Sequence, residues 1–304
     1  MNVLSSIAGL AVVLLLAPLV PGIANRTRAM LIGRRGAPVT QLYHDLWKLV
    51  RKGTVYSETT TWMFRLAPAV VLATAVVAAL LVPLDGRRAL VTFTGDAIAF
   101  VYLFALGRFV LVLAAMDTGS SFEGMGASRE VTFASYVEPG LFLCLIALGL
   151  VTGQFTLAGM LGAPLTERWS AAAPPLVMVA GSLFVLLLAE NSRVPVDDPA
   201  THLELTMIHE VMVLDHGGPD LALILYGVSL KLALFAALVV GALLPRAALD
   251  PPAALGALVG GLVAVGVAVG VVEATMARLR LSRVPFFIAA GSVLAAFGLI
   301  LLLR

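Results

Sequence analysis

The feature that most constrains this chain is a series of apolar stretches, each about long enough to cross a lipid bilayer. A transmembrane helix needs roughly 20 mostly apolar residues to span about 30 Å of hydrocarbon. Because hydrocarbon offers no partner to an open strand edge, every such span is expected to be a helix. Eight spans are predicted, near residues 3–20, 64–84, 97–116, 136–157, 174–189, 221–244, 253–272 and 284–303.

Composition agrees with this pattern, because the 304 residues are 60% hydrophobic and only 12% charged. We therefore predict an all-α, polytopic membrane protein that forms a single integral membrane domain over residues 1–304. The formal net charge of +2 leaves no basic face large enough for nucleic acid, which is excluded as a partner. The first stretch lacks a basic leader and a small-residue cleavage site, so it is interpreted as a retained span.

The sequence holds one cysteine, Cys144, inside an apolar run. Iron–sulfur clusters and nickel sites need several thiolate ligands, which one cysteine cannot supply. We therefore expect this chain to bind no cofactor and no metal, and we expect any redox metal to lie on another subunit.

The loops between the spans alternate in their content of lysine and arginine. The first loop, residues 23–63, and the last, residues 278–283, are rich in both, whereas the loops expected on the opposite side hold fewer. The positive-inside rule places the first and last loops in the cytoplasm and both termini outside. Arg87 and Arg88 argue mildly against this orientation. The predicted location is a bacterial or archaeal cytoplasmic membrane.

The first loop contains a predicted amphipathic helix at about residues 40–52. Apolar residues alternate there with charged ones, at Leu42, Leu46, Leu49 and Val50. Such a helix is best placed in the plane of the membrane interface. The alternative is a solvated connection.

Ionisable residues also occur inside or at the ends of the spans, where burial is costly. They are Asp96, Arg108, Glu138, Glu190, Lys231 and Glu273. Each one alone has a structural explanation, because residues near span ends reach water or headgroups. Together they indicate a hydrated polar interior.

The segment at about residues 190–220 concentrates seven carboxylates, three histidines and one arginine. Pro195 and Pro199 interrupt the helix, and a new helix is predicted over residues 200–215. There His202, Thr206 and His209 form a polar stripe with Glu210 beside it, whereas Leu203, Met207 and Leu214 form an apolar stripe.

Three interpretations of this segment compete. The first is a solvated surface loop, which does not explain the apolar half of the helix. The second is a metal site built from His202, His209, Glu204 and Glu210, whose spacing matches no known ligand motif. The third is a relay in which closely spaced carboxylates and imidazoles pass protons inward.

Three blocks carry a resemblance to a known family. The stretch "AENSRVPVDDPATHLELTMIHEVMVLDHGGPDLAL" resembles the membrane anchor subunit of formate hydrogenlyase and of group 4 membrane-bound nickel–iron hydrogenases. That family is similar to the quinone-site membrane subunit of respiratory complex I. The matching residues in this block are Glu190, Arg193, Pro195, Asp197 and Glu204-Leu205, whereas Val196 stands where an aromatic residue is expected.

The other two blocks occur in the family's order. The stretch "PVTQLYHDLWKLVRK" resembles the family's interface helix through Gln41, Asp45, Lys48, Leu49 and Lys52. The stretch "GSSFEGMGASREVTFASYVEPGL" matches a further block through Arg129, Ser135-Tyr136 and Glu138, with Val137 inserted.

The resemblance implies a non-catalytic subunit of an oxidoreductase complex that anchors a peripheral redox arm and couples electron transfer to proton or sodium movement. Its expected partners are an iron–sulfur small subunit, a hydrogenase-like large subunit, antiporter-like membrane subunits and the lipid bilayer. The iron–sulfur clusters and the nickel–iron centre are expected on those partners. The residues implied in docking are Gln41, Asp45, Lys48, Lys52 and Arg129. Those implied in coupling are Glu138, Glu190, Arg193, Asp197, Asp198, Glu204, Glu210 and Lys231.

Two alternatives stay open. The first is a complex I subunit with a quinone cavity, although the histidine-containing sequence after Glu204 favours the hydrogenase branch. The second is a stand-alone secondary transporter, a class that often shows two related halves with broken helices. No internal repeat is evident in the sequence, which disfavours the transporter.

Overall fold

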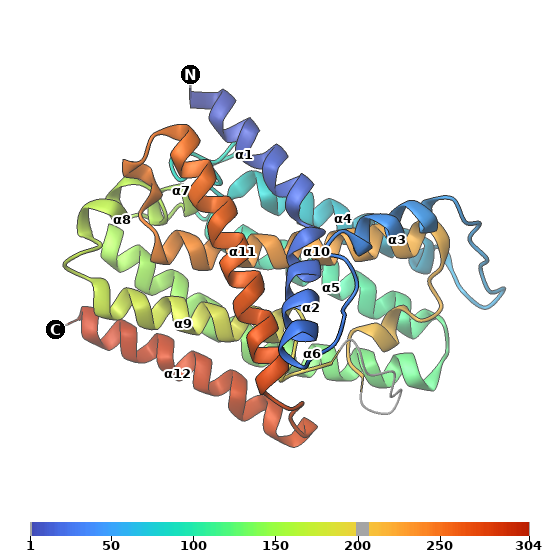
Figure 1. Cartoon of the computed structure of the whole chain (residues 1–304). Helices are drawn as coiled ribbons and strands as arrows, with labels where there is room; N and C mark the ends of the chain where they lie inside the picture. The colour runs from blue at the N-terminus through green and yellow to red at the C-terminus, as the bar shows by residue number, and fades with distance from the viewer. Residues whose placement is uncertain (1, 199–206, 304) are drawn as a thin grey trace.

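A computed structural model, which describes residues 2–198 and 207–303, shows helices and no strand among those residues (Figure 1). The α-helices are α1 (Asn2–Leu16), α2 (Leu19–Leu31), α3 (Gln41–Val50), α4 (Trp62–Leu81), α5 (Asp96–Asp117), α6 (Ser121–Thr152), α7 (Leu157–Met160), α8 (Ala163–Arg168), α9 (Ala173–Glu190), α10 (Gly218–Leu243), α11 (Pro251–Thr275) and α12 (Val284–Leu302). The 3-10 helices are η1 (Glu210–Val213), η2 (Arg246–Ala248) and η3 (Leu281–Arg283).

The prediction of an all-α protein with about eight spans is confirmed. Within the described ranges, seven helices are long and apolar enough to cross a membrane. An eighth span is formed if α1 and α2 are taken together as one helix bent by 45°. Pro18 lies at the bend and is followed at once by α2, which fits the tendency of proline to kink a helix.

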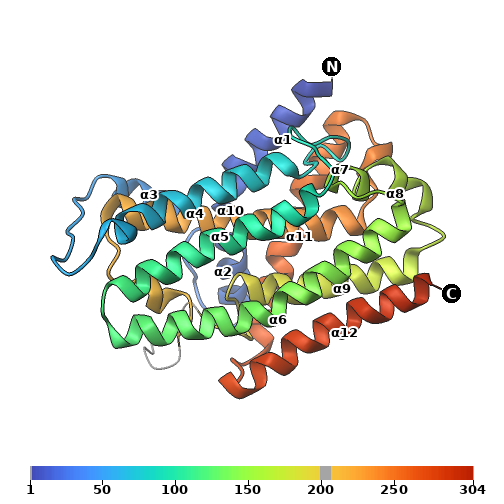
Figure 2. The same cartoon turned by 180° about the vertical axis from the view of Figure 1, so that it is seen from behind.

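Helix α10 lies at the centre of the bundle. In its most apolar 18-residue stretch 72% is buried, whereas in the corresponding stretch of the last span 28% is buried. It packs on α4, α9 and α11, while α12 packs on α6 and α9 at the edge. Figures 1 and 2 show α11 crossing over the other long helices, with α2 beside it. The apolar core is therefore continuous around α10.

The connections gather at two ends of the bundle, as the loop pattern of the sequence predicts. One end holds the loops 82–95, 153–172 and 244–250, and the N-terminal part of α1 is bonded there through Ser6 to Asp85. The other end holds α3, the α5–α6 turn, residues 191–198 and 207–217, and the loop 276–283. Its assignment to the cytoplasm stays a prediction from the positive-inside rule.

The predicted interfacial helix is confirmed as a helix in α3, which ends at Val50. None of its residues is buried, and Trp47 is 62% exposed under the guanidinium of Arg51. One side of α3 packs on α10. An exposed tryptophan on an amphipathic helix suits the membrane interface, where the ring is partly apolar and partly wet.

Two predicted helix boundaries are wrong, because part of the sequence assigned to each connecting loop is helical. The first loop was predicted to start at residue 23, but α2 continues to Leu31 and buries Val20 and Ala24. The fourth span was predicted over 136–157, but α6 starts at Ser121 and ends at Thr152. At 1.5 Å per residue, its 32 residues extend roughly 48 Å, well beyond the hydrocarbon thickness.

The prediction of an α-helix over residues 200–215 is also wrong for residues 207–215, the part of this range that the structure describes. From Met207 to Asp215 the only regular element is the 3-10 helix η1. The backbone of this stretch is held by tertiary contacts instead, because the Met207 carbonyl accepts from Arg129, and the Val211 side chain and the Ile208 carbonyl lie against Gly126 of α6. His202, Leu203, Glu204 and Thr206 lie outside the described residues.

Candidate functional site

A buried cluster of charges is centred on Arg108 of α5. Its Nη2 donates to Glu190 Oε1 over 2.8 Å, its Nη1 lies 3.5 Å from Glu138 Oε1 and its Nε lies 3.9 Å from Glu130 Oε1. The Arg108 side chain is only 8% exposed. One guanidinium thus faces carboxylates from both α6 and the end of α9.

Lys231 of α10 completes this cluster. Its Nζ lies 2.8 Å from Glu190 Oε1, the same oxygen that accepts from Arg108. The Glu190 side chain is 3% exposed, so its charge is out of water and is compensated by these two cations. A buried charge is tolerated when it is paired and hydrogen-bonded, and the lysine and the arginine supply both kinds of contact to Glu190. We call Arg108, Glu130, Glu138, Glu190 and Lys231 the inner cluster.

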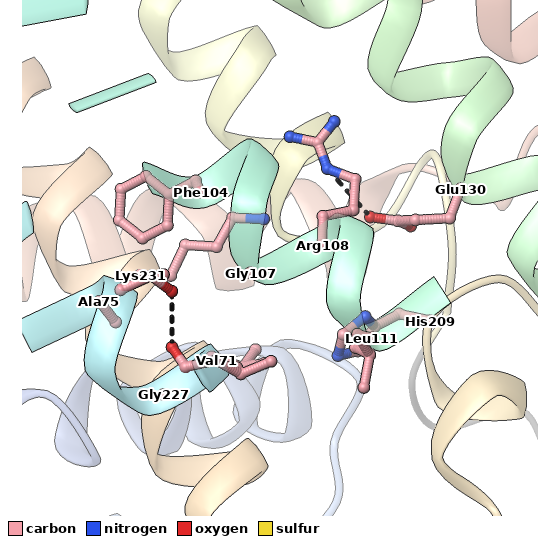
Figure 3. A pocket seen from close by; sticks show the side chains of 12 residues that line it. Val71, Ala75, Phe104, Gly107, Arg108, Leu111, Glu130, His209, Gly227 and Lys231 are labelled. Carbon is pink, nitrogen blue, oxygen red and sulfur yellow. Dashed lines mark hydrogen bonds and ion pairs between the residues drawn. The ribbon is translucent and has the colours of Figure 1, made fainter. Parts of the chain in front are cut away.

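A small cavity of about 40 Å³ lies against the inner cluster. Arg108, Glu130, Lys231 and His209 contribute to its wall (Figure 3). Thr74 and Gly107 face each other at its side, where a Cβ on Gly107 would lie 2.7 Å from the Thr74 hydroxyl. A cavity needs roughly 10–15 Å³ and several polar partners to hold a water molecule, so this one has room for water.

A second set of ion pairs surrounds the segment that follows Glu190. Arg193 Nη1 lies 3.2 Å from Glu273 Oε1 on α11. Arg28 on α2 makes a bidentate pair with Asp198, over 2.8 and 3.0 Å. We call these two pairs, together with the pair between Asp197 and Arg278, the outer cluster.

Asp197 organises the backbone within the outer cluster. Its carboxylate accepts from the Ile208 N–H over 2.9 Å and pairs with Arg278 Nη2 at 2.8 Å. Burial raises the pKa of Asp197, and these donors act against that shift. Since the Ile208 N–H is bonded there, Asp197 fixes the position of the chain just before His209.

A larger cavity of about 640 Å³ opens beside the outer cluster. Its wall combines parts of α2, α3 and α10 with residues from 191–197 and 209–213. The lining is apolar at Ile224, Leu225 and Leu232, and its mouth includes the exposed Arg34 and Arg35. This volume lies within the range of small-molecule sites, about 300–1,000 Å³.

The structure brings together three residues of the predicted coupling set, Glu138, Glu190 and Lys231, in the inner cluster. Arg193, Asp197 and Asp198 lie in the outer cluster, and Glu210 lines the larger cavity. Glu204 lies outside the described residues. The roles of these residues in coupling stay predictions.

The predicted docking residues divide into two groups. Gln41 Nε2 donates to Asp45 Oδ1 over 2.9 Å, and both residues line the larger cavity, whereas Lys48 and Lys52 are exposed. Arg129 Nη1 donates to the Met207 carbonyl over 2.9 Å, which ties α6 to the segment after residue 206. Arg129 therefore has a structural contact in addition to its predicted docking role.

The sequence analysis missed Glu130, which falls between the predicted spans 97–116 and 136–157 and was therefore not considered as a residue of the bundle. Glu130 and Glu138 lie eight residues apart, a spacing that belongs to one helical stripe. The signal that would have found it is Ser120-x-x-Glu123, the S-x-x-E pattern that marks a helix start. Arg108 was singled out as an ionisable residue within a span, but its place at the centre of the cluster needed the structure.

The described part of the chain shows no group of side chains suited to a redox metal. Among residues 2–198 and 207–303, no group of three or more histidine, cysteine, aspartate or glutamate side chains could hold a metal ion. Cys144 is buried and its thiol contacts the Ser182 hydroxyl at 3.2 Å. One buried thiol cannot ligate an iron–sulfur cluster.

Comparison with known proteins identifies the relatives of this chain. Hydrogenase-4 component C of Escherichia coli (strain K12) is 34% identical over 243 residues, which cover 80% of this chain and 76% of that protein. Formate hydrogenlyase subunit 4 of the same organism is 31% identical over 309 residues, covering 100% of this chain and 99% of that protein.

A solved structure shares the fold. It is that of the membrane-bound sulfane sulfur reductase, an archaeal respiratory membrane complex, in which one chain matches with a TM-score of 0.81. The match covers 98% of each chain at 20% sequence identity. The family described as NADH dehydrogenase matches residues 4–303. With almost its whole length matched, this chain belongs to the NADH dehydrogenase family of membrane proteins.

Proposed function

We propose that this chain is the non-catalytic membrane subunit of a hydrogenase- or formate-hydrogenlyase-type complex. It anchors a peripheral redox arm and links electron transfer in that arm to proton or sodium movement. The observation that carries the proposal is the inner cluster, in which three carboxylates and two cations lie within the bundle beside a cavity with room for water. The printed names of the relatives supply the class of complex.

The inner cluster has the properties that charge coupling needs. Ionisable groups inside a membrane bundle are costly and mark ion or proton pathways. Glu190 shares one oxygen between Arg108 and Lys231, so moving either cation changes how readily Glu190 takes up a proton. A change of charge at the docked arm is then compensated by proton uptake within the bundle.

The docking face lies at the end of the bundle that carries α3 and residues 191–198 and 207–217. Lys48 and Lys52 are exposed there, and the loop 276–283 adds Arg280 and Arg283. A cluster-bearing small subunit and a hydrogenase-like large subunit would bind at this end, and antiporter-like subunits would lie beside the spans. Lys48→Glu combined with Lys52→Glu is expected to lower the recovery of the arm subunits when the tagged chain is purified.

The test of coupling uses Glu190→Gln and Glu130→Gln in the intact complex, with Glu167→Gln as the matched control. Glu167 is an exposed carboxylate on α8, at the opposite end of the bundle. We expect both cluster variants to lower ion movement into vesicles at least tenfold per electron pair transferred, while the control is unchanged. Undiminished ion movement in both cluster variants would refute the coupling role.

The larger cavity favours a second candidate, a complex I type subunit that binds a quinone. Its volume of about 640 Å³ and its apolar floor suit a hydrophobic ring system with a short tail. Purification from the native membrane with metal analysis decides between the two. Nickel and a hydrogenase-like large subunit support the first candidate, whereas flavin, iron and inhibitor-sensitive quinone reduction support the second. A chain that elutes alone, without metal, would contradict both and favour a stand-alone transporter.

A further inference from the structure

The two cavities share part of their walls. Of the described residues, His209 and Val228 line both the cavity of about 40 Å³ and that of about 640 Å³. Valine cannot carry a proton, whereas an imidazole has two ring nitrogens that each bind one. His209 is therefore the ionisable group at the boundary between the larger cavity and the inner cluster.

The position of His209 is set on both sides by hydrogen bonds of the backbone. The preceding residue, Ile208, donates its N–H to Asp197, and the His209 carbonyl accepts from the Met212 N–H over 3.1 Å. Figure 3 shows the ring of His209 on the same side of the small cavity as Glu130 and Arg108. His209 thus lies in the wall of the small cavity together with members of the inner cluster, and its backbone is fixed by the bond from Met212 in η1.

Burial keeps the ring of His209 neutral. Burial lowers the pKa of His209 to about 4, and the ammonium group of Lys231 acts in the same direction. The carboxylates of Asp197 and Glu190 oppose that shift. A neutral imidazole accepts a proton on one nitrogen and releases the proton bound to the other, so it transfers protons without storing charge.

We propose that His209 is a relay residue through which protons pass between the larger cavity and the inner cluster. In the inward direction, a proton from the larger cavity binds one ring nitrogen and the proton on the other nitrogen leaves for the inner cluster. Exchange of the ring tautomer then restores the starting state, and no electron moves. This inference rests on the proposed function, because it names the entry to the same cluster.

The functional test compares His209→Gln and His209→Ala with His216→Gln in the intact complex. His216 is a matched control, because it is 4% exposed and lies in the same segment but lines neither cavity. We expect both His209 variants to lower ion movement at least tenfold per electron pair, and His216→Gln to change it less than twofold. Co-purification of the arm subunits confirms that each variant assembles.

Chemical rescue separates a relay from a structural role. In His209→Ala the truncated side chain leaves space beside the larger cavity, which is wide enough for a small buffer molecule. Added imidazole is expected to restore ion movement in this variant and to have no effect on the Glu190→Gln variant. If imidazole restores nothing in His209→Ala, the relay is overturned.

Labelling tests the geometry independently of coupling. In a Cys144→Ser chain, His209→Cys is expected to react with a small water-soluble thiol reagent, whereas His216→Cys stays unlabelled. An unlabelled His209→Cys would show that water does not reach this position and would overturn the relay. If Glu190→Gln lowers ion movement and His209→Gln does not, the relay fails while the proposed function stands. If neither variant lowers it, the proposed function fails and the relay fails with it.

Discussion

Replacing Arg108 by methionine tests whether the inner cluster is held together by charge. The change leaves Glu130 and Glu138 without the guanidinium that lies 3.9 and 3.5 Å away, and leaves Glu190 with Lys231 alone. Removing one partner of a buried ion pair costs about 3–5 kcal/mol, because the remaining charge is uncompensated. Since each kcal/mol shifts the unfolding midpoint by about 2–4 °C in chains of somewhat smaller size, we expect the midpoint to fall by about 10 °C.

The assay is thermal unfolding of the purified complex in detergent, followed by tryptophan fluorescence. Arg65→Met is the matched control, because Arg65 is exposed and lies over the Tyr56 ring at 4.6 Å. We expect that control to lose about 1 kcal/mol or less. The double variant Arg108→Met with Glu190→Gln is expected to be about 1–3 kcal/mol more stable than the sum of the single changes, because it removes a charge along with its partner. Additive effects, or an Arg108→Met midpoint equal to that of the control, would refute the reasoning.

Three further predictions concern the packing of α6, the outer cluster and the pH dependence of stability. Gly126→Ala places a Cβ 2.2 Å from a side chain of η1 and is expected to lower the yield of folded chain. Gly124→Ala is the control, because its Cβ meets open space and the yield should not change. Equal yields of the two variants in size-exclusion chromatography would contradict this prediction. Arg193→Met leaves Glu273, with a side chain 0% exposed, unpaired, and is expected to lower unfolding stability by about 3–5 kcal/mol, a loss that Glu273→Gln should partly restore. His216 has its pKa lowered to about 4 by burial, so the folded state binds fewer protons than the unfolded state and stability is lost as the pH falls from about 6.5 towards 4. His216→Phe should flatten the pH dependence of the unfolding midpoint in that window.

The sequence predicts where the spans lie because hydropathy reports the part of a helix that is buried in hydrocarbon. It does not report where a helix ends, because a helix continues into polar sequence when its polar end packs on protein. Helix α6 illustrates this, since its first turns carry Glu123 and Arg129, yet Glu123 is 1% exposed against the segment before α10. Helix α2 likewise continues past residue 23, where Ala24 is buried and Arg28 pairs with Asp198.

The candidate site is predictable in its residue types but not in its pairings. Lys231 and Glu190 stand out in the sequence because each lies in or beside an apolar run. That Lys231 and Arg108 share one carboxylate oxygen of Glu190 depends on the tertiary arrangement, which brings α5 and α10 to the end of α9. Glu130 was missed for a different reason, because an error in a helix boundary placed it outside the bundle.

The two clusters meet in one short segment, residues 190–198, which explains why ionisable groups gather there. Glu190 belongs to the inner cluster, and Arg193 belongs to the outer cluster three residues later. Asp197 and Asp198 tie the end of the segment to Arg278 and to α2. A buried ion pair costs several kcal/mol to break, so this segment cannot shift as a unit without a cost in both clusters. Under the proposed function, a movement imposed by a docked partner would therefore shift the groups that surround Glu190, and proton uptake at Glu190 would change the stability of the docked state in return.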